Sequence, residues 1–294
     1  MFEIWDQYRY VLSIHLFGNG YNKAAFAREI LMKNIVVCMK QVLDPEMPLS
    51  LFQIDTEARR AIPPRATPPV LSPFDENALE AALRIKDAQE VTITVICLGK
   101  RLTKAVVTIS LAAGADRLIL LQDKVFDEFN TLLTSRALAA AIRKLEDVDL
   151  ILCGLQAADT NNGQVGTHIA GILNIPCITA ARKVEFDGDV LRIEKSMSDG
   201  YEVIETTSPA LVTVTGEVGT LRKPDMEAYI SAARKPVTTW DAGELGMETG
   251  YTDHKSIVRM KTPVYPENCE ILEGTSPEEM AVNLAEKLKE INVI

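Results

Sequence analysis

The sequence predicts an α/β fold, with a mostly parallel sheet that carries helices on both faces. Between residues 35 and 173, short apolar runs alternate with segments whose apolar residues recur at helical spacing. The run 91–98 is β-branched at nearly every position, as expected for a strand that is covered on both sides. Residues 150–173 have the order strand, polar loop, helix. This βαβαβα order is typical of a parallel, Rossmann-like sheet.

The first long helix is predicted by the residues that begin it. Ser72 suits the N-cap and Pro73 suits the first helical position. The carboxylates of Asp75 and Glu76 suit the positive end of a helix. The preceding segment, 44–69, has several prolines and little periodicity, so we expect a long surface loop there.

The pattern changes after Ala180, where we expect antiparallel strands. Residues 183–195 predict a hairpin with a tight Asp-Gly turn, and strands at 201–206 and 210–215 follow at meander spacing. Beyond residue 216 the sequence indicates no further strand–helix unit. The other predicted elements are strands at 35–39, 118–121, 150–153 and 177–180, and helices at 104–113, 130–145, 165–173 and 280–291.

The polar loop within 150–173 is a candidate anion site. Residues 159–163 are small, and an Asn or Asp at the end of the loop can cap the helix that follows. A strand, a short loop and a helix present unpaired backbone N–H groups and a positive helix end to an anion. The same spacing also fits an ordinary strand-to-helix connection. The loop lacks the glycine spacing of a dinucleotide fingerprint and the Gly-Lys-Ser/Thr of a P-loop.

Other strand ends point to the same place, because ligands of parallel sheets bind beyond the carboxyl ends of the strands. We expect residues 38–40, 71–75, 98–99 and 159–167 to converge on one crevice.

Composition and motifs exclude several function classes. The net charge of −10 argues against nucleic acids and anionic membranes as main partners. The five cysteines lack the paired spacing of zinc or iron–sulfur sites, which favours a reducing, cytoplasmic location. No apolar run reaches the roughly 18–20 residues that span a bilayer. His168 is the only histidine near the loop, where a cap or packing role is commoner than a base. No Ser/His/Asp order appears, so we expect no catalysis by the protein's own side chains.

Several motifs resemble, in the same order, the β subunit of electron transfer flavoproteins. The most specific is the stretch 149–166, and residues 232–236 match the end of that family's partner-recognition loop. The likeness runs from Met32 nearly to the C-terminus. The other matching motifs are 35–42, 72–77, 111–117 and 172–176.

The resemblance implies a heterodimer with an α subunit that holds the main redox flavin. The β subunit would be an electron carrier rather than a stand-alone enzyme. It would pass electrons between NADH or an acyl-CoA dehydrogenase and a second redox partner. Motif matching implies that the nucleotide site is lined by Cys38, Ser72, Pro73, Phe74, Asp75, Leu98, Asp159, Thr160, Asn161, Asn162, Gly163, Gln164, Val165, Gly166 and Thr167.

Two nucleotides are compatible with the resemblance. Simple members hold AMP in this crevice, whereas electron-bifurcating members and relatives associated with nitrogen fixation or carnitine metabolism hold a second FAD. The spacing from Asp159 to Gln164 is short, as in the FAD type, although residues 160–162 depart from that type's usual Gly-Asp-Thr. Tyr229 stands where simple members carry a leucine that docks on an acyl-CoA dehydrogenase. We favour FAD, with AMP as the alternative.

Three parts of the chain are expected: an N-terminal extension at 1–31, a nucleotide-binding domain at 32–215, and a recognition loop with a C-terminal arm at 216–294 that packs on the α subunit. The extension is either sequence outside the native fold or an amphipathic docking segment, and the tail helix packs either on a partner or on its own sheet. A stress-protein-like nucleotide-binding module predicts a domain that ends near Ala180, and the long arm argues against it. A substrate-adenylating enzyme would need a Ser-Gly-Gly-type loop after the first strand, which residues 40–44 do not form.

Overall fold

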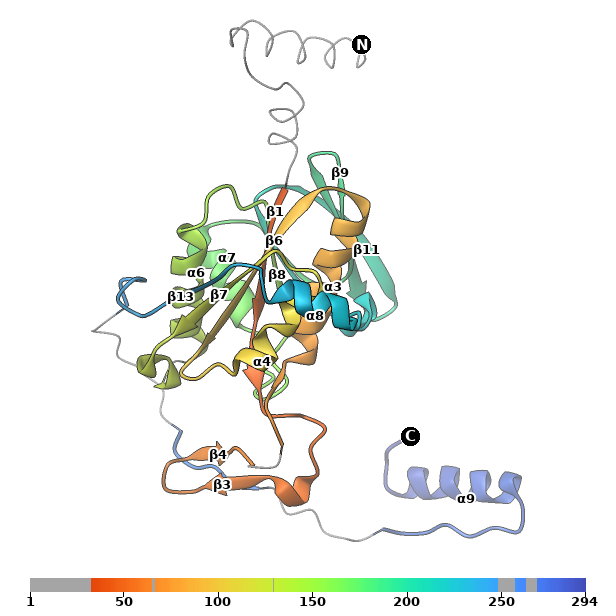
Figure 1. Ribbon diagram of the computed structural model, residues 1–294. Coiled ribbons are helices and arrows are strands. Elements are labelled where there is room, and N and C mark those ends of the chain that lie inside the picture. The colour runs from red at the N-terminus through yellow and green to blue at the C-terminus, as the bar shows by residue number, and fades with distance from the viewer. Residues whose placement is uncertain (1–32, 65–66, 129, 248–256, 263–268) are drawn as a thin grey trace, which may run out of the picture. The chain divides into compact units, whose positions relative to one another are not determined.

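A nine-stranded sheet forms the centre of the structure, in the order β11-β10-β9-β12-β8-β1-β6-β7-β13 (Figure 1). All neighbouring pairs from β9 to β13 are parallel, and β10 is antiparallel to both of its neighbours, β9 and β11. The predicted α/β class is therefore confirmed. The strands are β1 (Lys33–Met39), β6 (Val91–Gly99), β7 (Arg117–Gln122), β8 (Leu150–Gly154), β9 (Cys177–Asp187), β10 (Val190–Met197), β11 (Gly200–Thr207), β12 (Ala210–Val214) and β13 (Val237–Trp240).

This computed structural model describes residues 33–64, 67–128, 130–247, 257–262 and 269–294. The extension expected at 1–31 lies outside the described residues. The chain divides into two compact units, one of residues 1–52 and 62–257 and the other of residues 53–61 and 258–294. The sheet belongs to the first unit. No described helix combines the length and the hydropathy needed to cross a membrane.

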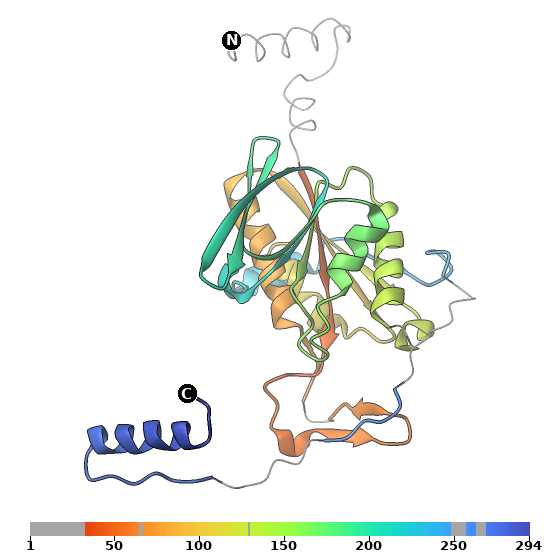
Figure 2. The same ribbon diagram turned by 180° about the vertical axis from the view of Figure 1, so that it is seen from behind.

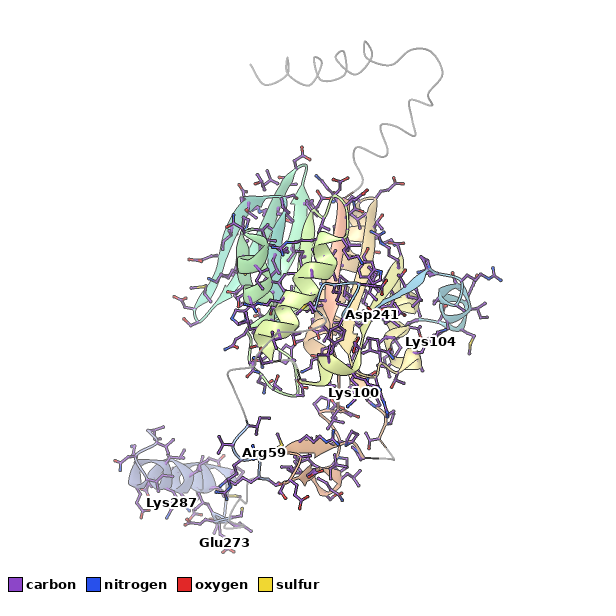
Figure 3. All side chains as sticks on the ribbon, turned by 90° about the vertical axis from the view of Figure 1, so that its left-hand side faces the viewer. Arg59, Lys100, Lys104, Asp241, Glu273 and Lys287 are labelled. Atoms are coloured by element: carbon purple, nitrogen blue, oxygen red, sulfur yellow. The ribbon has the colours of Figure 1, made fainter. Side chains whose placement is uncertain are left out.

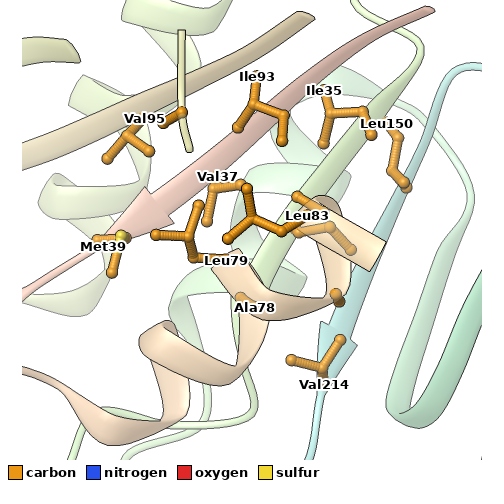
Figure 4. Packing of buried hydrophobic residues seen from close by; sticks show 14 of the residues in the cluster. Ile35, Val37, Met39, Ala78, Leu79, Leu83, Ile93, Val95, Leu150 and Val214 are labelled. Carbon is orange, nitrogen blue, oxygen red and sulfur yellow. The ribbon is translucent and has the colours of Figure 1, made fainter. Parts of the chain in front are cut away.

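Helices cover both faces of the sheet. On one face, α6 and α7 pack against each other (Figure 2). On the other face lie α3 and α5, and buried residues of both helices share one core with the strands. Figure 4 shows the part of this core in which Ala78, Leu79 and Leu83 of α3 lie against the strands. The helices of the first unit are α3 (Pro73–Ala88), α4 (Lys104–Val107), α5 (Ile109–Ala113), α6 (Thr131–Arg143), α7 (Val165–Leu173) and α8 (Met226–Ala232), with short 3-10 turns η1 (Leu49–Leu51), η2 (Lys124–Glu128) and η3 (Gly216–Val218).

Strand β1 shows why its sequence reads as a continuous apolar run. Side chains of a strand alternate between the faces of the sheet. Ile35, Val37 and Met39 pack in the core with α3, whereas Val36 and Cys38 pack in the core under α6 and α7. Because both faces of the sheet are covered, β1 has no solvent-exposed face for polar residues. Its sequence therefore lacks the alternation of apolar and polar residues that is typical of a half-exposed strand.

The predicted helix starts are also confirmed. Asn130 is the N-cap of α6, and its side-chain oxygen accepts a hydrogen bond of 2.9 Å from the backbone N–H of Leu133. Ser72 occupies the N-cap of α3, although its hydroxyl makes no capping bond. The helix expected at 104–113 is divided at Thr108 into α4 and α5.

Two expectations for the second half of the chain are wrong. We expected 210–215 to continue a meander, but β12 returns between β8 and β9 and is parallel to both. Its five residues are all buried, which suits an interior position. We also expected no further strand–helix unit after residue 216, yet α8 leads into β13, which pairs in parallel with β7. β13 is a short edge strand with three exposed residues, so it lacks the apolar run of the inner strands.

A third difference concerns residues 177–187, which form the single strand β9 rather than two short runs. The pairing of β9 with β12 shifts register near Ala180, whose φ is +59°. The hairpin expected after it is present, with Gly188 at φ +62° in the turn to β10.

The second unit contains the two-stranded sheet of β3 (Gln53–Asp55) and β4 (Arg60–Ile62) and the tail helix α9 (Pro277–Glu290). Lys287 lies on α9 (Figure 3). Its ammonium group pairs with Glu270 at 3.2 Å and with Glu290 at 3.3 Å. No described side chain of α9 is buried. The first unit also contains a small antiparallel pair, β2 (Gln41–Val42) with β5 (Val70–Leu71).

Candidate functional site

The carboxylate of Asp75 joins three elements at the carboxyl ends of the strands. Asp75 is buried in the first turn of α3, and one of its oxygens accepts the backbone N–H of Lys40 at 2.9 Å, directly after β1. Its other oxygen accepts the N–H of Gly154 at 3.1 Å, at the end of β8. A side chain at position 154 would lie 2.6 Å from the carbonyl carbon of Phe74. Glycine therefore lets β8 approach the start of α3.

Burial raises the pKa of Asp75 from 3.8 to about 7, because the charged carboxylate is removed from water. The two backbone N–H bonds, the charge of Lys40 and a hydrogen bond with Ser72 oppose this effect only in part. The base of the site therefore holds a carboxyl group that titrates near neutral pH.

Ser72 connects the start of α3 with the loop that follows β8. Its backbone N–H donates to the carbonyl of Lys40 at 2.8 Å, and its buried hydroxyl accepts the N–H of Ala158 at 3.4 Å. The hydroxyl thus holds the loop instead of capping the helix. Together with the bond between Lys40 and Asp159, these contacts bring together 38–40, 71–75 and the beginning of 159–167. No side-chain hydrogen bond or ion pair among the described residues joins 98–99, which was also expected at the crevice, to them.

The loop itself consists of a tight turn and two left-handed residues. The N–H of Asn161 donates to the carbonyl of Ala157 at 2.9 Å. Asn161 and Gly163 have φ values of +50° and +61°, a region that asparagine and glycine occupy more readily than other residues. Residues 159–164 are exposed. The small residue types therefore follow from the backbone path of the loop.

The helix that follows begins without a side-chain cap, contrary to the expectation that an Asn or Asp at the end of the loop caps it. Gln164 is the N-cap and makes no capping bond, and the first intrahelical bond runs from the N–H of His168 to the carbonyl of Gln164 at 2.9 Å. Within the described residues, the N–H groups of Val165, Gly166 and Thr167 have no acceptor. These groups are available to an anion.

A second helix end lies beside the first. The hydroxyl of Thr131, in the first turn of α6, donates to the side-chain oxygen of Gln164 at 2.8 Å. Ser135 donates to the carbonyl of Val165 at 3.2 Å. The positive ends of α6 and α7 are thus neighbours, which strengthens the local preference for negative charge. Sequence reasoning did not identify Thr131, because its partner is 33 residues away.

Lys40 belongs to the stretch 38–40 that the sequence placed at the crevice, but it was not among the predicted nucleotide-binding residues. Its ammonium group lies 2.8 Å and 2.7 Å from the two carboxylate oxygens of Asp159. The available signal was its position, directly after the buried strand β1 and therefore at the carboxyl edge of the sheet.

The remaining candidates differ in their surroundings. Cys38 and Leu98 face the side of the sheet covered by α6 and α7, and Cys38 is the register partner of Cys153 on β8. A thiol–thiol hydrogen bond and burial raise the pKa of Cys153 well above its usual value, so the Cys153 thiol is a poor nucleophile at neutral pH. Pro73 is exposed and Phe74 is half-buried in the first turn of α3.

The described residues of this site give little indication of histidine-based or metal-based chemistry. The ring nitrogen Nδ1 of His168 is buried and has no partner within the described parts of the chain. Among those same residues, no group of three His, Cys, Asp or Glu side chains could hold a metal ion. The arrangement of these described residues is suited to holding an anion.

Comparisons with known proteins agree with one another. Residues 65–245, more than half of the chain, match the model of the electron transfer flavoprotein domain. The chain is 40% identical over 215 residues to the electron transfer flavoprotein subunit beta of Clostridium acetobutylicum, covering 73% of this chain and 81% of that one. It is 34% identical over 265 residues to the caffeyl-CoA reductase-Etf complex subunit CarD of Acetobacterium woodii (88% and 99%). It is 35% identical over 220 residues to the protein FixA of Azotobacter vinelandii (73% and 76%).

Proposed function

Because this chain belongs to the electron transfer flavoprotein family, as a β subunit, we propose that its crevice binds FAD and that it works in a heterodimer with an α subunit. The observation that carries the proposal is the set of N–H groups at the start of α7 that have no acceptor among the described residues. The loop before this helix pairs with the ammonium of Lys40 through Asp159. Bound FAD would supply the electron-transfer chemistry. The protein would supply the binding groups and the electrostatic environment.

The donor set of the crevice fits the phosphates of a nucleotide. The N–H groups of Val165, Gly166 and Thr167 and the positive ends of α6 and α7 all favour negative charge. Gly166 contributes by being small, since a side chain there would lie 2.8 Å from the methyl group of Thr213 on β12. α7 can therefore start close to the sheet.

The short loop favours FAD over AMP. Five residues separate Asp159 from Val165, whereas AMP-type members carry a longer loop in the resemblance described above. AMP remains the alternative ligand, and it would use the same phosphate-binding groups.

A surface for a redox partner is proposed at α8. Met226, Tyr229 and Ile230 are 75%, 44% and 59% exposed on this helix. The segment before α8 is fixed to α3, because Arg222 pairs with Glu80 at 3.1 Å and with Asp87 at 2.8 Å. We propose that an acyl-CoA dehydrogenase or a similar flavoenzyme docks on this apolar surface. NADH would donate electrons at a different surface of the complex.

The flavin content of the heterodimer tests the proposal. Purification with the α subunit should give a yellow complex, and denaturing extraction followed by chromatography should release two FAD per heterodimer. One FAD plus one AMP would establish the alternative and would argue against electron bifurcation. A colourless chain without nucleotide would contradict a nucleotide site of either kind.

Replacing Gly163 by valine should weaken nucleotide retention. Its φ of +61° is strained for a β-branched residue, so the loop beside Asp159 and α7 would change its path. We expect about a tenfold loss of affinity, equivalent to about 1.4 kcal/mol, in equilibrium dialysis.

Gly188→Val is the matched control. Gly188 has nearly the same φ, +62°, but lies in the hairpin turn between β9 and β10 and has no neighbour within 4 Å of an added side-chain carbon. Its nucleotide content should equal that of the wild type. Equal nucleotide retention in the Gly163→Val and Gly188→Val variants would show that the loop does not contribute to the nucleotide site.

A further inference from the structure

An ion pair connects the end of β1 with the loop after β8. The ammonium of Lys40 lies within 2.8 Å of both carboxylate oxygens of Asp159, and 119 residues separate the two in sequence. The side chains are 42% and 31% exposed. Pairs with this degree of exposure contribute little to the stability of a fold. The position of the pair, at the carboxyl edge of the sheet, therefore matters more than its contribution to stability.

The backbone of Lys40 is held on both sides. Its N–H donates to Asp75 at 2.9 Å, and its carbonyl accepts the N–H of Ser72 at 2.8 Å. Only the flexible stem of the lysine can move. Its ammonium group can therefore change partners while its point of attachment stays at the crevice.

The carboxylate of Asp159 is also held at the crevice by its backbone. The preceding N–H, of Ala158, donates to the hydroxyl of Ser72 at 3.4 Å, and the turn around Asp159 is closed by the bond from Asn161 to Ala157. The backbones of Lys40 and Asp159 are therefore both fixed, and their side chains form the ion pair between the two segments.

The charges of the two partners assign them opposite roles toward an anion. An ammonium group has three N–H donors and attracts phosphate. A carboxylate has no donor and repels phosphate. The start of α7, which follows the loop of Asp159 in the chain, has the same positive character as Lys40. An incoming phosphate and Asp159 would therefore compete for the same ammonium group.

We propose that Lys40 binds a phosphate of the nucleotide, and that Asp159 is the counter-ion which this phosphate displaces. The proposal rests on the proposed nucleotide site and deepens it. The proposal also changes the role of Asp159. The family resemblance implies that Asp159 holds the phosphate, whereas here it competes with the phosphate for the ammonium group of Lys40.

The test uses the full chain, with AMP and adenosine as probes in isothermal titration calorimetry at low salt. Lys40→Met should weaken AMP binding about tenfold, because a charged hydrogen bond is lost. Asp159→Asn should strengthen AMP binding about two- to fivefold, because the competing charge is removed. Adenosine, which has no phosphate, should bind equally to both variants and to the wild type.

Two further variants make the test specific. Asp159→Asn should strengthen AMP binding less in the Lys40→Met background than in the wild type, since without the lysine only the direct repulsion between Asp159 and phosphate is relieved. Lys40→Arg should keep most of the affinity, which shows that charge rather than folding is measured. The matched control is the exposed pair of Lys183 and Glu185, 2.7 Å apart on β9, whose variants Lys183→Met and Glu185→Gln should leave AMP binding unchanged.

Three results would overturn the proposal. The first is that Asp159→Asn weakens AMP binding as much as Lys40→Met does. The second is that either variant reduces adenosine binding to the same degree as AMP binding. A wild-type chain that binds neither AMP nor FAD would instead refute the nucleotide site, and the competition between Lys40 and phosphate with it.

Discussion

Replacing Gly154 by valine is expected to destabilise the first unit by about 3–5 kcal/mol, the largest effect of any single substitution considered for this chain. The added Cβ would lie 2.6 Å from the carbonyl carbon of Phe74 and 2.6 Å from a carboxylate oxygen of Asp75. The first contact is with backbone, so no side-chain rotation can relieve it. Either β8 or the first turn of α3 must move, and the 3.1 Å bond between Gly154 and Asp75 is then lost.

Urea denaturation followed by circular dichroism measures this effect. Gly171→Ala is the control, because Gly171 lies in α7 and an added carbon there meets nothing within 4 Å. Alanine favours a helix over glycine, so this variant should be as stable as the wild type or slightly more stable. A Gly154→Val protein with wild-type stability would show that β8 and α3 are not in the close contact described above.

The second large effect concerns the pH dependence of stability at Asp75. The pKa of this carboxyl is raised to about 7 in the folded chain, from 3.8 without burial. Between about pH 4 and 7 the unfolded chain loses this proton while the folded chain keeps it, so folding becomes less favourable as pH rises. The contribution is fully present below about pH 4 and is lost as pH rises through 7. Its size is on the order of a few kcal/mol.

Asp75→Asn removes this titration. The asparagine has one acceptor oxygen for the two N–H groups of Lys40 and Gly154, so the variant should be less stable than the wild type at pH 4–5. The difference in free energy of unfolding should shrink as pH rises toward 8, because only the wild type must then hold a buried charge. Urea denaturation at a series of pH values gives this difference directly. A gap that widens with pH would mean that the two N–H bonds outweigh burial.

Structural features that depend on neighbouring residues in the sequence were predicted correctly. The N-cap of α6 follows from Asn130 and the run behind it, and the start of α3 follows from Ser72 and Pro73. The strand–loop–helix order of 150–173 was also predicted, and β8 and α7 have the expected ranges. In each case the signal lies within a few residues of the element.

Structural features that depend on contacts between residues far apart in the sequence were missed. The strand ends placed residues 38–40 and 159–167 at one crevice, but they indicated neither the ion pair of Lys40 with Asp159 nor the bond of Thr131 with Gln164. The position of β12 between β8 and β9 is also a matter of long-range pairing, since its sequence suits any interior strand. β13 was missed because an edge strand is covered on fewer sides and needs fewer apolar residues.

The sequence by itself determined the α/β class, the order of most elements, and the resemblance to a flavoprotein subunit. It could do so because strands covered on both faces must be apolar throughout, and because helix ends require particular residues. Only the tertiary structure decided that Asp75 bonds the ends of β1 and β8, that two helix ends lie side by side, and that Lys40 faces Asp159. These contacts join segments far apart in the chain, and it is the packing of the whole sheet that brings them within hydrogen-bond distance.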